Sequence, residues 1–142
     1  MVRAEALTPD AIIASMETGD FYASTGVVLS DIVSSATGLA IRIEGEPGVT
    51  YVTQFVGTRV GYDIAVQEVP HFGGLPVTQR YSSDVGTVLA ERSGLAPEYT
   101  FAGDEIYVRA RVTSSKVVEN PVSAGDVETA WLQPVVVRSG GR

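Results

Sequence analysis

One stretch, Asp104–Thr113, constrains the fold more than any other part of the chain, because apolar and polar residues alternate along it without a break. Successive side chains of a β-strand point to opposite faces of the sheet. One face of this stretch carries Ile106, Val108, Ala110 and Val112, and the other carries Glu105, Tyr107, Arg109 and Arg111. The pattern predicts a strand with one buried and one wet face, which is typical of antiparallel sheets.

Further β-rich segments, separated by turn signals, occupy most of the remaining chain. Residues 22–29 are broken by Gly26, and 38–44 alternate and lead through Glu46-Pro47-Gly48 into 49–56, which predicts a hairpin. Residues 60–69 form another candidate strand, and 85–91 fit a strand or a short helix equally well. Residues 127–137 close the series, with Pro134 indicating an edge position or a bulge.

These segments amount to about seven or eight short strands, a pattern typical of an antiparallel β-sandwich, Ig-like or jelly-roll-like, or of a barrel-like sheet. A chain of 142 residues and 15.0 kDa is long enough to bury its own core. We therefore expect one domain over residues 1–142, with strands over 20–138 and a flexible tail at 139–142.

A single short helix is predicted near the start of the chain, over residues 8–18. Thr8 suits the N-cap and Pro9 the first helical position, and Gly19 is placed to end the helix in a left-handed conformation. Leu7 and Ile12 have the spacing of a hydrophobic staple. Ile12, Ile13 and Met16 form an apolar stripe, which we expect to pack on the sheet or on a neighbouring domain.

Composition argues against several classes of function. The net charge is −7 and the arginines are scattered, so neither nucleic acid nor an anionic membrane surface is an expected partner. The absence of cysteine and the presence of one histidine exclude thiolate and multi-histidine metal sites. No cofactor, metal or enzymatic activity is expected. No secretory signal is recognisable, which leaves a cytoplasmic location, or secretion from a longer precursor.

Candidate chemistry is sparse. His71 lies in a Gly-rich loop and has no identifiable catalytic partners. Gly73-Gly74 and Gly57–Gly61 lack the residues of nucleotide-binding loops and are expected to be turns. Carboxylates pair along the sequence at Glu44 and Glu46, Asp104 and Glu105, and Asp126 and Glu128, and we expect them to be solvated.

Aromatic residues offer one further possibility. Tyr107 falls on the polar face of its strand, where an exposed ring could contribute to a sugar-binding platform. Trp131 lies between Ala130 and Leu132 and is expected in the core. The candidate ligand or interface residues are Tyr107, Arg109, Arg111 and His71.

Three segments together carry a family resemblance. They are Leu7–Ile12 leading to Gly19–Gly26 (GDFYASTG), Gly103–Val112 with Ser114–Lys116, and Ala130–Val135. They resemble the end of PHP-domain (polymerase and histidinol phosphatase-like) metal-dependent phosphoesterases. In that family a last barrel helix is followed by a Gly-x-x-Tyr-Ala-Ser/Thr-x-Gly turn that enters a C-terminal β domain.

The resemblance implies a C-terminal β domain without its catalytic barrel. PHP barrels hold their metals with several histidines and acidic residues that begin with a His-x-His pattern, and this chain has no such pattern. No metal ligand can therefore be carried over. The expected function is that of a non-catalytic accessory or interaction module, whose partner is a catalytic barrel domain or another copy of itself. The alternatives are a carbohydrate-binding module and a structural subunit of a homo-oligomeric assembly.

Overall fold

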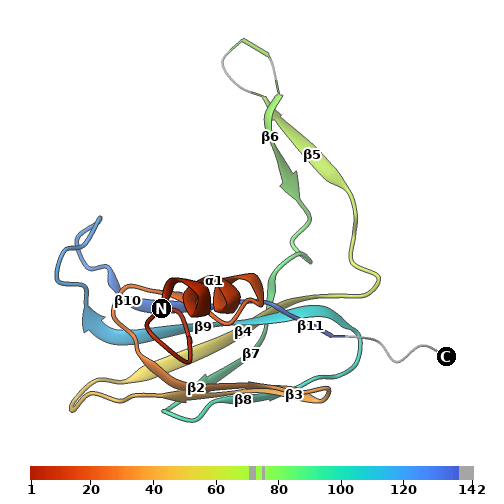
Figure 1. The fold of residues 1–142 in the computed structure, drawn as a ribbon. Coiled ribbons are helices and arrows are strands. Elements are labelled where there is room, and N and C mark those ends of the chain that lie inside the picture. Colours follow the sequence, from red (N-terminus) through yellow and green to blue (C-terminus); the bar gives the residue numbers. More distant parts are fainter. Residues whose placement is uncertain (71–72, 75, 138–142) are drawn as a thin grey trace.

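The chain folds into antiparallel sheets with one short helix, as the alternation predicts, and the architecture is that of a β-sandwich. The computed structural model describes residues 1–70, 73–74 and 76–137 (Figure 1). The expected tail at 139–142 and the site candidate His71 lie outside the described residues.

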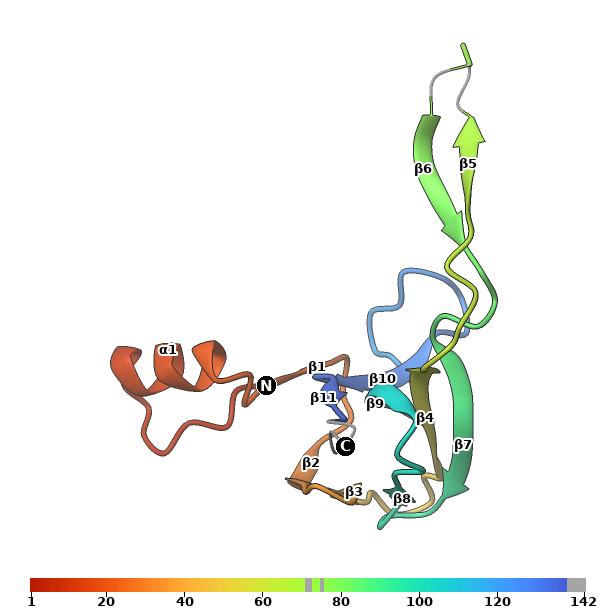
Figure 2. The same ribbon diagram turned by 90° about the vertical axis from the view of Figure 1, so that its right-hand side faces the viewer.

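Two sheets face each other across the core (Figure 2). The large sheet has the order β1 (Tyr22–Ser24), β10 (Val127–Leu132), β9 (Glu105–Val117), β4 (Tyr51–Arg59) and β7 (Thr87–Ser93), and β11 (Val135–Val136) also pairs with β9. The small sheet has the order β2 (Leu29–Ser34), β3 (Gly38–Ile43) and β8 (Glu98–Thr100).

The core lies between the inner faces of these sheets. Phe55 of β4 is fully buried and its ring stacks on Tyr99 of β8, with ring centroids 5.4 Å apart. Burying an aromatic side chain of this size contributes roughly 1.5–3 kcal/mol. The other buried apolar residues are Tyr22, Val27, Leu29, Leu39, Ile41, Ile43, Tyr51, Val108, Ala110, Val112, Ala130 and Leu132.

The predicted hairpin of residues 38–44 and 49–56 is wrong, because its two strands belong to different sheets. β3 pairs with β2 and β8, whereas β4 pairs with β7 and β9. The turn at Glu46–Gly48 carries the chain from one layer to the other. Strands that are neighbours in sequence are usually neighbours in a sheet, and here the crossover replaces that arrangement.

The expected strand over 22–29 is likewise divided between the layers. It contains β1, which joins the large sheet, and only the first residue of β2, which joins the small one, and the chain crosses between them around Gly26. A Cβ atom at Gly26 would come within 2.1 Å of the Glu128 side chain, so this crossing requires the absence of a side chain.

A separate hairpin of β5 (Val66–Pro70) and β6 (Pro76–Tyr81) projects from the sandwich (Figure 1). Only its first strand overlaps the predicted segment 60–69. The sequence predicted neither β6 nor β8, nor β2 beyond Leu29. The undecided segment 85–91 is a strand, β7, from Thr87 onward. The predicted strand 127–137 is interrupted beside Pro134, between β10 and β11.

The helix α1 (Pro9–Glu17) begins and ends as the sequence predicts. The Thr8 side chain accepts a hydrogen bond from the Ala11 amide, and Gly19 follows the helix with φ of +79°. The hydrophobic staple is wrong, since Leu7 is 95% exposed. Within the described chain α1 buries none of its residues, and it extends away from both sheets (Figure 2). Among the described residues, no helix has the length and apolar character needed to cross a membrane.

Candidate interaction surface

The outer face of the large sheet brings together three of the residues that the sequence singled out. Tyr107, Arg109 and Arg111 alternate along β9 with Val108, Ala110 and Val112, and the latter three are fully buried on the inner face. The three outer side chains are half-buried. The period of the strand therefore places one aromatic and two cationic groups in a row on the face that points away from the core.

The alternation fails at the start of the strand. Ile106, expected on the buried face, is exposed, and Glu105, expected on the wet face, is 1% exposed. The cause is a β-bulge: Arg59 pairs with Glu105 and Thr58 with Tyr107, so Ile106 is an extra residue without an opposite partner.

The two arginines lie against one tryptophan, which the sequence had placed in the core. Trp131 of β10 is opposite Arg111 and is half-buried on the outer face. The guanidinium carbon of Arg109 lies 4.7 Å from its ring centroid, and that of Arg111 lies 5.0 Å away. Both distances are within the range of cation–π attraction. The indole therefore holds two like charges on one small area of surface.

These two arginines have few ion-pair and hydrogen-bond partners in the described part of the chain. Neither Arg109 nor Arg111 forms an ion pair with a described residue, and the Nε atom of each is buried without a hydrogen-bond partner there. Arg3, Arg42 and Arg59, by contrast, each pair with a carboxylate.

One amide side chain connects the pair to the rest of the sheet. Arg111 Nη2 donates to Gln54 Oε1, and Gln54 Nε2 donates to Glu91 Oε2 at 2.8 Å. Glu91 thus contacts Arg111 only through a neutral amide. Arg109 has no equivalent connection to any described residue, and it is the less compensated of the two charges.

A small aromatic hollow adjoins the other end of this row. It has a volume of about 240 Å³ and is bordered by Tyr107, by Tyr62 and Tyr81 at the base of the β5–β6 hairpin, and by Thr58, Val85 and Ile106. Thr58 Oγ1 lies 3.4 Å from the Tyr107 hydroxyl and accepts a hydrogen bond from the Gly86 amide at 3.0 Å. These contacts hold the Tyr107 ring in place at the edge of the hollow.

Two projections stand at the ends of the outer face. The β5–β6 hairpin rises from one end and the connection between β9 and β10, residues 118–126, rises from the other, both on the side opposite the small sheet (Figure 1). We refer to the row Tyr107, Arg109, Arg111 with Trp131 and Gln54 as the arginine–tryptophan surface.

The carboxylates of the three sequence pairs do not gather at one place. Glu44, Glu46, Asp104 and Asp126 are exposed, as expected, but Glu105 and Glu128 are buried and correct the expectation of solvated pairs. The structure contains no group of three or more described His, Cys, Asp or Glu residues that could hold a metal ion.

Glu105 is the centre of a closed hydrogen-bond cluster. It accepts hydrogen bonds from the Tyr99 hydroxyl at 2.6 Å and from the backbone amides of Ala102 and Gly103 at 2.9 Å each. Burial by itself raises the pKa of this carboxyl, but these donors outweigh burial and lower the pKa to about 2. Burial and the hydrogen bond to Glu105 raise the pKa of Tyr99 to about 12. The cluster fixes the turn that leads into β9.

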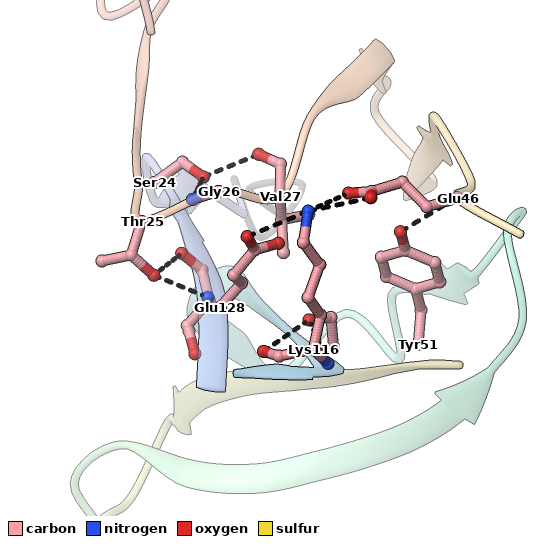
Figure 3. A network of polar contacts seen from close by, with 10 residues as sticks. Ser24, Thr25, Gly26, Val27, Glu46, Tyr51, Lys116 and Glu128 are labelled. Atoms are coloured by element: carbon pink, nitrogen blue, oxygen red, sulfur yellow. Dashed lines mark hydrogen bonds and ion pairs between the residues drawn. The ribbon is translucent and has the colours of Figure 1, made fainter. Parts of the chain in front are cut away.

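Glu128 belongs to a second network, at the opposite end of the sandwich (Figure 3). Lys116 Nζ lies 2.8 Å from both carboxylate oxygens of Glu46 and 3.3 Å from Glu128 Oε1. The hydrogen bonds to Glu46 raise the pKa of Lys116. Figure 3 also shows how close Glu128 lies to the turn at Gly26. The network joins β9, β10 and the β3–β4 connection, and in it one lysine faces two carboxylates.

Trp131 and Gln54 are the surface residues that sequence reasoning missed. The signal for Trp131 was available, because Val127, Thr129 and Trp131 alternate with Glu128, Ala130 and Leu132, and the second set is buried. Gln54 could not be found in this way, since only the pairing of β4 with β9 places it beside Arg111.

Comparison with models of protein families, with curated proteins and with solved structures found no match.

Proposed function

We propose that this chain is a non-catalytic accessory module that binds a neighbouring protein domain through α1. The observation that carries the proposal is the position of this helix, which extends away from the sandwich. None of its own residues is buried by the described part of the chain, and the side chains of Ile13 and Met16 are 54% and 51% exposed. A helix with an uncovered apolar face is marginal by itself and is stabilised by packing against a partner.

The resemblance to PHP-domain proteins supplies the kind of partner. In that family the matching segment is the last helix of the catalytic barrel, and the Gly19–Gly26 turn leads from it into the β domain. Here α1 is followed by that segment, which contains β1, the first strand of the sandwich. The proposed partner is therefore a metal-dependent phosphoesterase barrel, and the β-sandwich is its accessory domain.

Light scattering on the purified chain tests docking through α1. Without a partner domain, the uncovered helix should drive self-association, so that the measured mass rises above 15.0 kDa with concentration. A variant with Ile13→Ser and Met16→Ser should remain monomeric and keep its melting temperature, because neither residue packs in the core. The matched control is Val33→Ser with Val122→Ser, two exposed valines elsewhere on the molecule.

Two outcomes would contradict the proposal. A wild-type chain that stays monomeric at every concentration would argue against docking through α1. Hydrolysis of p-nitrophenyl phosphate by the purified chain in the presence of Mn²⁺ or Zn²⁺ would argue against a non-catalytic role. The mass should also be indifferent to these metals, since the proposal gives them no site on this chain.

A second candidate function is carbohydrate binding at the aromatic hollow. The specific observation in its favour is that Tyr62 and Tyr81 gather with Tyr107 around the hollow, where aromatic rings offer an apolar platform. Tyr81 is 61% exposed, so Tyr81→Ala should abolish glycan binding without unfolding the chain. A glycan array that shows no binding to the wild-type chain would exclude this candidate.

A further inference from the structure

The arginine–tryptophan surface combines features that one structural role does not explain. Arg109 and Arg111 lie against Trp131 at 4.7 and 5.0 Å, and neither has a carboxylate partner among the described residues. The Nε atoms of both are buried and unpaired there. Buried donors without partners cost free energy, which offsets part of what the contact with the indole contributes to the fold.

The contact with the indole restricts where the two guanidinium groups can lie. An arginine restricted in this way has lost part of its side-chain freedom before any ligand arrives, and a guanidinium is a planar fork of donors that matches a carboxylate. The protein has a net charge of −7, yet no carboxylate of the described chain occupies this position. The charge of the surface is complementary to an acidic ligand.

The shape of the surface favours a protein ligand over a small acid. Small molecules bind in concave sites, whereas Arg109, Arg111 and Trp131 lie on a sheet face and do not border the hollow beside Tyr107. Arginine, tryptophan and tyrosine are the residues most enriched at the energetic centres of protein interfaces. The hairpin and the 118–126 connection flank this face (Figure 1).

We infer that the arginine–tryptophan surface binds an acidic segment of a partner protein, with Arg109 and Arg111 each donating hydrogen bonds to one carboxylate while Trp131 contacts both cations. The inference rests on the proposed role as an interaction module, and it adds a second contact that is chemically different from the apolar docking of α1. The two arginines are two residues apart on one strand, which separates their Cα atoms by about 6.8 Å. An extended Glu-x-Glu segment presents its carboxylates with the same spacing.

A capped peptide, acetyl-Glu-Thr-Glu-Thr-Glu-amide, is a direct probe of this surface. Trp131 is the only tryptophan in the chain, so the single indole N–H signal in a ¹H–¹⁵N NMR spectrum reports on it without further assignment. Titration with the peptide at low ionic strength should shift this signal in a saturable way, and added salt should weaken the binding. The same peptide with Gln in place of Glu should leave the signal unchanged.

Variants separate the arginines from general electrostatics. Arg109→Gln should weaken peptide binding at least about tenfold, because a charge-assisted hydrogen bond is lost. Arg109→Lys should lose part of the affinity, since it keeps the charge but not the fork. Arg92→Gln is the matched control: it makes the same change of charge on β7, and it should bind like the wild type.

Three results would overturn the inference. They are an indole signal that does not respond to the Glu peptide, an equal response to the Gln peptide, and an equal response to acetate at the same concentration of carboxylate, which would indicate a simple ion effect. The Ile13→Ser and Met16→Ser variant should bind the peptide normally. The experiment can therefore fail while docking through α1 holds, and the reverse is also possible.

Discussion

Two charged groups on β9, Glu105 and Arg109, are removed from water in opposite ways. Glu105 is 1% exposed, and its two oxygens accept three hydrogen bonds from Tyr99, Ala102 and Gly103. Arg109 is half-buried beside an indole, with its Nε unpaired and no carboxylate in reach among the described residues. The charge of Glu105 is compensated by donors inside the fold, whereas the charge of Arg109 is held beside the indole without a carboxylate partner among the described residues.

The difference separates groups that stabilise the chain from groups that are available to something outside it. A carboxylate surrounded by donors from its own backbone is part of the folding free energy. A guanidinium that is positioned but uncompensated contributes little to folding, and it is ready to pair with an external carboxylate. The comparison predicts that variants at the two positions have unequal effects on stability.

The largest effect is expected for Glu105→Gln. One of the two oxygens is replaced by an NH₂ group, which faces a backbone amide donor instead of accepting from it. We expect a loss of about 3 kcal/mol in the free energy of unfolding, measured by urea denaturation. Asp104→Asn, at the exposed neighbour, is the control and should cost much less. Equal losses at the two positions would remove the basis of the comparison.

The dependence of stability on pH should follow from the same carboxyl. Its pKa is about 2 in the folded chain and 4.5 in its unperturbed state, so the folded state favours the ionised form. The resulting stabilisation is fully present above pH 4.5 and is lost as the pH falls toward 2, by up to roughly 3 kcal/mol. The Glu105→Gln variant should lack this part of the acid dependence. Identical slopes for the variant and the wild type between these pH values would contradict the assignment.

A smaller effect is expected for Tyr99→Phe. The variant keeps the ring that stacks on Phe55 and removes only the hydroxyl that donates to Glu105 at 2.6 Å. The expected loss is about 1–2 kcal/mol, together with a rise in the pKa of Glu105. NMR titration of the Glu105 carboxyl measures this rise directly, and an unchanged pKa would show that the amides alone are sufficient.

The smallest effect is expected for Arg109→Gln. Because this guanidinium has no described ion-pair partner, its removal costs mainly the contact with Trp131 and should change the free energy of unfolding by less than about 1 kcal/mol. Thermal denaturation followed by circular dichroism measures the change. A loss comparable to that of Glu105→Gln would mean that Arg109 is structural, and the contrast between the two groups would disappear.

The sequence predicted the faces of the strands better than their partners. A period of two placed Arg109 and Arg111 on the outer face, because that pattern depends only on neighbouring residues. The same reasoning was wrong for Glu105, because the bulge at Ile106 arises from the pairing of β9 with β4. The 38–44 and 49–56 segments were recognised as strands, but their division between two sheets depends on contacts with distant segments.

For the candidate surface, the sequence likewise predicted the residues that share one strand and missed those on the neighbouring strands. Tyr107 and the two arginines lie on one strand and could be grouped by spacing alone. Trp131 and Gln54 reach them only through the pairing of β10 and β4 with β9, which no local pattern contains. The burial of Glu105 was hidden for a related reason, since its donors belong to a turn whose shape the residue types do not specify.

The pairing of the first strand with the penultimate one has a consequence for how the chain reaches its folded state. Thr25 and Thr129, 104 residues apart, exchange hydrogen bonds beside this pair of strands. Contacts between residues so far apart in the sequence are slow to form. During synthesis, β1 has no partner in its sheet until β10 has left the ribosome, so Tyr22 and its neighbours stay exposed to aggregation until residues 127–132 have emerged.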